Sequence, residues 1–153
     1  MNRLTTLFFT ISILFLSGCQ VPKNGDEYHY DEGGILKQID SYENGAVTRA
    51  EFYYESGVLE QIRSFENSLL SRTEFYDESG NLYEINSFEN GLVSRYEFFN
   101  KDGTLKQIRS FENGLPTRAE FYDESGVLEQ IDFYDNGLPS RYEFFNKDGT
   151  LKQ

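Results

Sequence analysis

The sequence predicts an all-β protein, a single-layer antiparallel β-meander built from 23-residue hairpin repeats and twisted or curled along its length. Three observations predict this fold. A 23-residue pattern recurs about five and a half times without insertion, each copy contains two turn signals, and the segments between turns are rich in aromatic and aliphatic residues. A fixed period of this size is typical of a repeat array rather than of a globular domain with one centre.

Equivalent positions in successive copies form columns, and the clearest copy is residues 120–142. One column consists of glycines: Gly34, Gly57, Gly80, Gly103, Gly126 and Gly149. Another consists of isoleucines: Ile39, Ile62, Ile85, Ile108 and Ile131. Because the spacing never slips, each copy should occupy an equivalent place in the fold.

Each copy contains two turns. Residues 123–126 are polar and end on Gly126, which can adopt positive φ, and residues 135–137 include the hairpin-forming pair Asn136-Gly137. Loops of four and three residues at these places leave two strands of eight residues, each about 27 Å long. A two-residue Asn–Gly loop with one bulge per repeat fits the same period. We prefer the first arrangement and leave the second open.

The preferred register assigns the side chains to two faces. One face holds Phe121, Leu128, Gln130, Asp132 and Tyr134. The other holds Glu120, Tyr122, Glu129, Ile131 and Arg141. Neither face is apolar enough to require a second layer, so we expect a single sheet with water on both sides. The same register predicts two runs of adjacent like charges, which would cost stability: Glu51–Glu60–Glu74 and Glu120–Glu129–Glu143.

Residues 1–18 have the pattern of a signal peptide, with a positive start and an apolar run over residues 4–16. Leu16-Ser17-Gly18-Cys19 then resembles a bacterial lipobox. This resemblance implies that Cys19, the only cysteine, is diacylated and begins the mature chain. The alternative is an ordinary secretory signal with an incidental cysteine.

The predicted domains are therefore a lipoprotein signal peptide at 1–18, a lipidated tether at 19–27 and the repeat array at 28–153. The lipid would anchor the protein to a membrane of the cell envelope. Because Gln20 rather than Asp follows the cysteine, the resemblance implies the outer membrane if the source has two membranes.

The formal net charge is −12, which disfavours binding to nucleic acid and to anionic lipid headgroups. It favours an unknown protein partner with a basic surface, or divalent cations, although solubility alone accounts for it equally well. Calcium could bind the Asp123-Glu124-Ser125-Gly126 loop and its equivalents, but turn chemistry explains these residues without a metal. We expect no metal and no cofactor.

The sequence also contains no candidate catalytic residues. With one histidine and an acylated cysteine, His29 is the only base available to a nucleophile, and the carboxylates recur in columns rather than as an unlike acid–base pair. We therefore predict that the chain is not an enzyme. His29 replaces a column of Phe in the first copy, and we interpret it as a substitution tolerated in a capping repeat.

The candidate interaction surface combines two columns on one face. The aromatic column is Tyr30, Tyr53, Tyr76, Phe99, Tyr122 and Phe145, and the arginine column is Arg49, Arg72, Arg95, Arg118 and Arg141. Exposed Tyr and Arg are enriched at binding hot spots. The alternative is that the rings stack only to stiffen the sheet, and both interpretations stay open.

Tyr134-Asp135-Asn136-Gly137, Phe144-Phe145 and Asp148-Gly149-Thr150-Leu151 resemble the MORN-repeat variant family of bacterial hairpin arrays, and the resemblance covers residues 28–153. Many members carry an antitoxin label. We expect a membrane-anchored bacterial lipoprotein whose array is a non-enzymatic protein-interaction or spacer module. The alternative is an immunity or antitoxin-like lipoprotein that neutralises a basic toxin.

Overall fold

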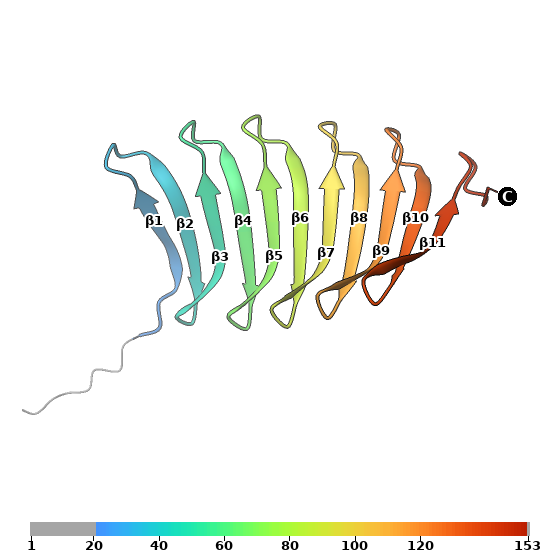
Figure 1. The fold of residues 1–153 in the computed structure, drawn as a ribbon. Coiled ribbons are helices and arrows are strands. Elements are labelled where there is room, and N and C mark those ends of the chain that lie inside the picture. The colour runs from blue at the N-terminus through green and yellow to red at the C-terminus, as the bar shows by residue number, and fades with distance from the viewer. Residues whose placement is uncertain (1–20, 153) are drawn as a thin grey trace, which may run out of the picture.

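The computed structural model describes residues 21–152, and these form one antiparallel sheet of eleven strands in chain order (Figure 1). The strands are β1 (Gly25–Tyr30), β2 (Leu36–Glu43), β3 (Ala46–Tyr53), β4 (Leu59–Glu66), β5 (Leu69–Tyr76), β6 (Leu82–Glu89), β7 (Leu92–Phe99), β8 (Leu105–Glu112), β9 (Leu115–Tyr122), β10 (Leu128–Asp135) and β11 (Leu138–Phe144). Among these residues there is no helix, and so none that could span a membrane.

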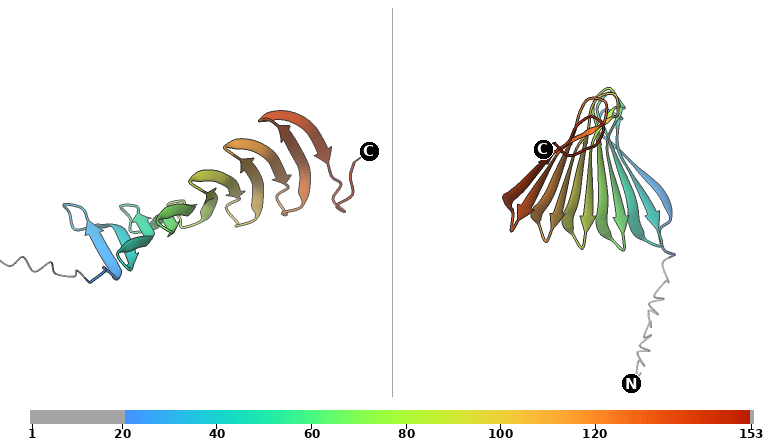
Figure 2. Two further views of the ribbon diagram at one scale, coloured as in Figure 1. Left: turned by 90° about the horizontal axis from the view of Figure 1, so that it is seen from below. Right: turned by 90° about the vertical axis from the view of Figure 1, so that its right-hand side faces the viewer.

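The predicted fold class is confirmed. Each strand pairs only with its neighbours in the sequence, and the sheet is a single open layer. Figure 2 shows that the strands bend along their length and fan out when the array is viewed end-on. The short turns lie together at one end of the strands, which we call the Asn–Gly rim, and the longer turns lie at the other end, the long-turn rim (Figure 1).

The preferred loop lengths are wrong. The alternative is correct in its two-residue Asn–Gly loop but wrong in its single bulge per repeat, because the register shifts at both strand pairings of a repeat. Asn136 and Gly137 have φ of 49° and 79°, and a turn with two positive φ values has the twist that matches a hairpin. Five residues, 123–127, form the longer turn. The register then shifts twice per repeat, at Leu128/Gln130 and at Phe133/Tyr134, so each repeat contains two bulges.

Hydroxyl side chains mark the bulge beside the Asn–Gly rim. The Ser140 hydroxyl donates to the backbone carbonyl of Phe133 at 3.1 Å. Thr48, Ser71 and Thr117 make the same bond to Ser41, Ser64 and Ser110 at 3.3, 3.1 and 3.2 Å. These bonds give a physical reason for a column that contains only Ser or Thr.

Aspartates hold the longer turns in shape, as turn chemistry predicted. Asp123 Oδ1 accepts the backbone N–H groups of Ser125 and Val127, each at 2.9 Å. Hydrogen bonds from the Ser125 hydroxyl and from these amides hold the pKa of Asp123 below its usual range. In the copies that begin with Asn100 and Asn146, Asp102 and Asp148 perform the same role by accepting the N–H of Thr104 and Thr150.

The bulges preserve the predicted faces at the strand centres but change which residues lie opposite one another. Glu120 lies opposite Ile108 on one side and Ile131 on the other. The predicted runs of like charge are therefore wrong, because the bulge removes Glu129 from this ladder. The same bulge places Leu128 opposite Tyr122 rather than beside Phe121. We call the face on which Glu120 lies between Ile108 and Ile131 the isoleucine face. The opposite face, which carries Phe121, is the phenylalanine face.

The core of the array is a line of small and branched side chains along the strand centres. Its members are Ala50, Ile62, Ile85, Ile108, Ala119 and Ile131, all at most 6% exposed. On the isoleucine face each of the four buried Ile residues lies between Glu residues of the two neighbouring strands. Side chains of the same layer shield these isoleucines from water.

The first strand begins earlier than predicted. Residues up to 27 were assigned to the tether, but β1 starts at Gly25 and pairs with β2 from there. Lys23 and Asn24 also bind the first Asn–Gly turn. The Lys23 carbonyl accepts the Gly45 amide at 2.8 Å, and the side-chain oxygen of Asn24 accepts the Asn44 amide at 2.7 Å. The array boundary therefore lies before Gly25, because the Lys23 carbonyl and the Asn24 side-chain oxygen both accept amides of the first hairpin.

Candidate functional site

The predicted arginine and aromatic columns lie on the isoleucine face, joined by a column of glutamates. Arg72 Nε donates to Glu74 Oε1 at 2.8 Å, and the Tyr76 hydroxyl donates to the other oxygen of Glu74 at 2.6 Å. The same arrangement links Arg49, Glu51 and Tyr53. In the third triad the Tyr122 hydroxyl donates to Glu120, and Arg118 Nε lies 3.0 Å from Glu120 Oε1 as an ion pair without hydrogen-bond geometry. Alternation places residues i, i+2 and i+4 on one face, so each triad comes from a single strand.

The two remaining arginines of the column are also paired. Arg95 binds Glu97 at 2.6 Å and Arg141 binds Glu143 at 3.3 Å, but Phe99 and Phe145 cannot complete a triad because they lack a hydroxyl. Arg118 and Arg141 additionally lie over the Phe133 ring, at 5.6 and 4.0 Å from its centroid. The arginines of the column therefore contact glutamates and a phenylalanine ring of the same sheet.

Exposure separates the first member of the aromatic column from the rest. Tyr53, Tyr76, Phe99, Tyr122 and Phe145 are half-buried, whereas Tyr30 is 60% exposed. Tyr30 follows Tyr28 at the position where later copies have Glu, so its copy cannot form the triad. The geometry favours the stiffening interpretation for the half-buried rings. Cys19, the predicted lipidation site, lies outside the described residues.

The triads predict a late ionisation of three tyrosines. Burial, together with the hydrogen bond to Glu, raises the pKa of Tyr53, Tyr76 and Tyr122 to about 12. Since the value in an unfolded chain is about 10, the stability that these groups contribute is complete below pH 10 and is lost as the pH rises towards 12.

Replacing all three tyrosines by Phe should remove the late step from an ultraviolet titration of tyrosinate. It should also flatten the fall in stability between about pH 10 and 12. Phe99 shows that the column accommodates Phe. An unchanged late step in the triple variant would contradict the assignment.

The Asn–Gly rim carries a second repeated surface that the sequence analysis did not identify. The leucines that follow the turns are at least half exposed: Leu69 55%, Leu92 52%, Leu115 50% and Leu138 71%. Each lies opposite an exposed acid; these pairs are Leu69–Glu66, Leu92–Glu89, Leu115–Glu112 and Leu138–Asp135. Within residues 21–152, none of these acids forms an ion pair.

Two neighbouring turns of this rim enclose a shallow groove. A groove of about 290 Å³ lies between the turns at residues 67–68 and 90–91, lined by Leu69, Leu70, Phe88, Glu66 and Glu89 among others. Neighbouring strands are about 4.8 Å apart, so the leucines recur roughly every 10 Å. The signal available in the sequence was a column of Leu directly after a two-residue turn, where little chain is present to cover it.

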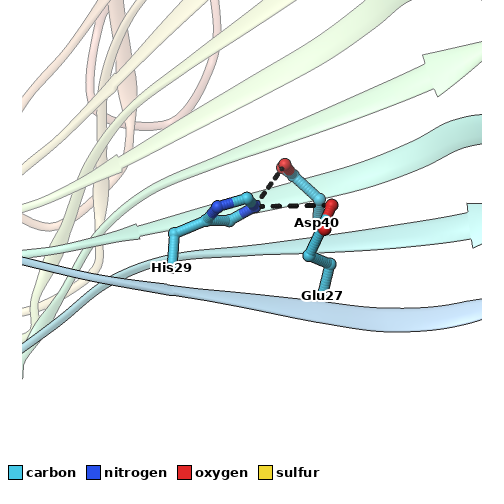
Figure 3. A group of neighbouring side chains, drawn as sticks. All are labelled: Glu27, His29 and Asp40. Atoms are coloured by element: carbon cyan, nitrogen blue, oxygen red, sulfur yellow. Dashed lines mark hydrogen bonds and ion pairs between the residues drawn. The ribbon is translucent and has the colours of Figure 1, made fainter.

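A third group of side chains lies at the N-terminal end of the array (Figure 3). His29 Nε2 lies 3.0 Å from Asp40 Oδ2 and 3.7 Å from Glu27 Oε2. Lys23 Nζ binds Glu27 at 2.6 Å. The sequence predicts only a capping substitution at His29, because the cluster depends on the pairing of β1 with β2.

Comparison of the sequence with known families identifies the repeats. Residues 23–44, 48–67, 72–90 and 118–136, together more than half of the chain, match the MORN repeat variant family. No curated protein is significantly similar to the chain in sequence.

Solved structures with partial similarity to this chain include three bacterial proteins or complexes. A point mutant of S. aureus TarM, solved in complex with fondaparinux, alpha-GlcNAc-glycerol and UDP, is 14% identical with a TM-score of 0.50, covering 70% of this chain and 22% of TarM. The Gap123 complex of Streptococcus agalactiae is 18% identical with a TM-score of 0.49, covering 67% of this chain and 20% of the other. A structure of accessory secretory proteins 1, 2 and 3 of Streptococcus pneumoniae is 21% identical with a TM-score of 0.47. The match covers 65% of this chain and 19% of the other.

This chain spans about a fifth of the length of those proteins. At such low identity the similarity to TarM concerns the fold alone. The family assignment rests instead on the four matched segments, each of which includes the Tyr or Phe, the acid and the Asn of one short turn. The chain belongs to the MORN repeat variant family.

Proposed function

We propose that the protein is a lipid-anchored, non-enzymatic interaction module of the bacterial cell envelope, and that its Asn–Gly rim binds a basic protein partner. The family assignment supports a repeat protein. The observation that carries the proposal is the row of exposed leucines, each opposite an acid without an ion-pair partner among the described residues.

Charge complementarity defines the partner. The glutamates of the isoleucine face are neutralised by their own arginines, whereas the acids of the rim are not. A partner surface with Lys or Arg beside apolar side chains would satisfy both the acids and the leucines. Because the motif recurs about every 10 Å, such a partner could contact several turns at once, and its affinity would depend on the number of turns engaged.

Three neutralising substitutions test the rim. The triple variant in which Gln replaces Glu66, Glu89 and Glu112 should capture at least tenfold less partner from native envelopes. Quantitative mass spectrometry measures the captured amount. The structure offers a matched control on the opposite rim, the triple replacement of exposed Glu55, Glu78 and Glu124 by Gln. This control changes the net charge equally and should leave capture unchanged.

Two results would contradict the proposed rim. Equal losses in the two triple variants would mean that capture depends on net charge alone. Retained capture in the Glu66, Glu89 and Glu112 variant would place the binding surface elsewhere, with the exposed first member of the aromatic column, Tyr30, as the remaining candidate.

The lipid anchor is a separate part of the proposal and rests on Leu16-Ser17-Gly18-Cys19. Cys19→Ala should abolish labelling with palmitate and release the protein from membranes, because the lipid chains supply the membrane affinity. Unchanged labelling would contradict the lipoprotein interpretation. The soluble array should keep its β-sheet circular dichroism spectrum in either case.

A second candidate is an immunity or antitoxin-like lipoprotein, which the same acidic rim would suit if the partner were a basic toxin. Growth distinguishes the two candidates. A neutralising protein should protect cells that produce the captured partner, and the Glu66, Glu89 and Glu112 variant should lose this protection. Harmless production of the partner without the lipoprotein would exclude the antitoxin role.

A further inference from the structure

Two residues of the first copy depart from columns that are otherwise free of metal ligands. His29 stands where all later copies have Phe, and Glu27 stands where they have Ala, Thr or Tyr. Both departures are on β1, and the pairing of Tyr28 with Ile39 places them beside Asp40 on β2. Figure 3 shows the three side chains converging from the two strands.

The separations between these ligand atoms fit a tetrahedral metal ion. Zn²⁺ binds imidazole nitrogen and carboxylate oxygen at about 2.0–2.2 Å, so two ligands of a tetrahedral site lie about 3.3–3.5 Å apart. His29 Nε2 lies 3.0 Å from Asp40 Oδ2 and 3.7 Å from Glu27 Oε2, on either side of that value. All three ligand atoms lie within 4.8 Å of one another, so small rotations of the side chains would bring them to the required spacing.

Neighbouring groups orient the two carboxylates. Gln38 Nε2 donates to Asp40 Oδ1 at 2.7 Å, which leaves Oδ2 directed at His29. The Tyr42 hydroxyl donates to Glu27 Oε2 at 3.1 Å. Such supporting hydrogen bonds commonly position metal ligands. The side chains of His29 and Glu27 are 44% and 43% exposed, so the cluster is open to solvent for an ion and a water ligand.

We propose that Glu27, His29 and Asp40 bind a divalent transition-metal ion of the Zn²⁺ class, with water completing the coordination. Imidazole and carboxylate together suit this class of ion. The ion links β1 to β2 and so holds the terminal strand on the array. Lys23 competes with it, because its ammonium group binds Glu27 at 2.6 Å and must move away when the ion enters.

The chain provides a clear probe, since His29 is its only histidine. Addition of one equivalent of Zn²⁺ to the detergent-solubilised full chain should shift the NMR signals of this imidazole. Calorimetry with Zn²⁺ should show one site, which His29→Gln abolishes. Lys23→Met should tighten binding several-fold, a gain that a misfolded variant would not show.

Asp132 supplies the matched control. It occupies the same column as Asp40 and accepts the same bond from the preceding Gln, Gln130 Nε2, at 2.5 Å. Asp40→Asn should weaken Zn²⁺ binding at least tenfold, while Asp132→Asn should leave it unchanged. Imidazole signals that do not move with Zn²⁺, or equal affinities for the Asp40 and Asp132 variants, would reduce the cluster to an ordinary ion pair at a capping repeat.

Discussion

Replacing Ile85 by Ala should lower the free energy of unfolding by about 2–3 kcal/mol, the lower part of the range for such truncations. Ile85 is 5% exposed and lies opposite Glu74 and Glu97 in the centre of the sheet. The loss should fall in the lower part of the range because the single layer allows the flanking side chains to relax into the space. Urea unfolding followed by circular dichroism measures it.

Leu92→Ala is the control for this prediction. Leu92 is 52% exposed on the Asn–Gly rim, so its truncation should change the free energy of unfolding by no more than about 0.5 kcal/mol. Similar losses at the two positions would show that the isoleucine ladder is not the core. An unchanged free energy of unfolding would show that this rim leucine is not needed for stability.

The sequence was sufficient for the fold because every column carries the same information five or six times. Asn136-Gly137 and its equivalents mark each short turn, and the glycine column marks each longer one. Two turns in a period of 23 residues leave room only for two short strands. The order of pairing then follows from short connections between neighbours.

The bulges could not be derived in the same way. Loops of four and three residues, together with two strands of eight, add up to the 23-residue period. Loops of five and two residues with two bulges add up to it equally well. Both arrangements put Ile131 and Glu120 on one face, so alternation does not separate them. The column of Ser and Thr, with hydroxyls that close the bulge, was the signal that could have decided the case.

The candidate sites show the same division. The triads follow from alternation within one strand, so the grouping of Arg, Glu and Tyr was predicted, although their mutual hydrogen bonds were not. The His29 cluster depends on the register between two strands, and the exposure of Leu92 depends on the short turn. Both require the loop lengths that the sequence left open.

The central claim is that the array consists of interchangeable 23-residue units in a single sheet, and a pair of deletions tests it most directly. Removing residues 97–119 joins Tyr96 to Glu120 and recreates a complete strand from the halves of β7 and β9. Every column stays in phase, so a sheet shortened by one hairpin should form. Removing residues 97–107 joins Tyr96 to Ile108 instead, which puts the next Asn–Gly turn at the wrong rim.

Both variants are compared with the parent by circular dichroism, limited proteolysis and urea unfolding. The 23-residue deletion should keep the β-sheet spectrum and resist protease, with a cooperative transition of slightly lower stability and a smaller dependence on urea, since less surface is buried. The 11-residue deletion should lose protease resistance and cooperative unfolding. If the two deletions behave alike, the hairpin-repeat account of this protein is wrong.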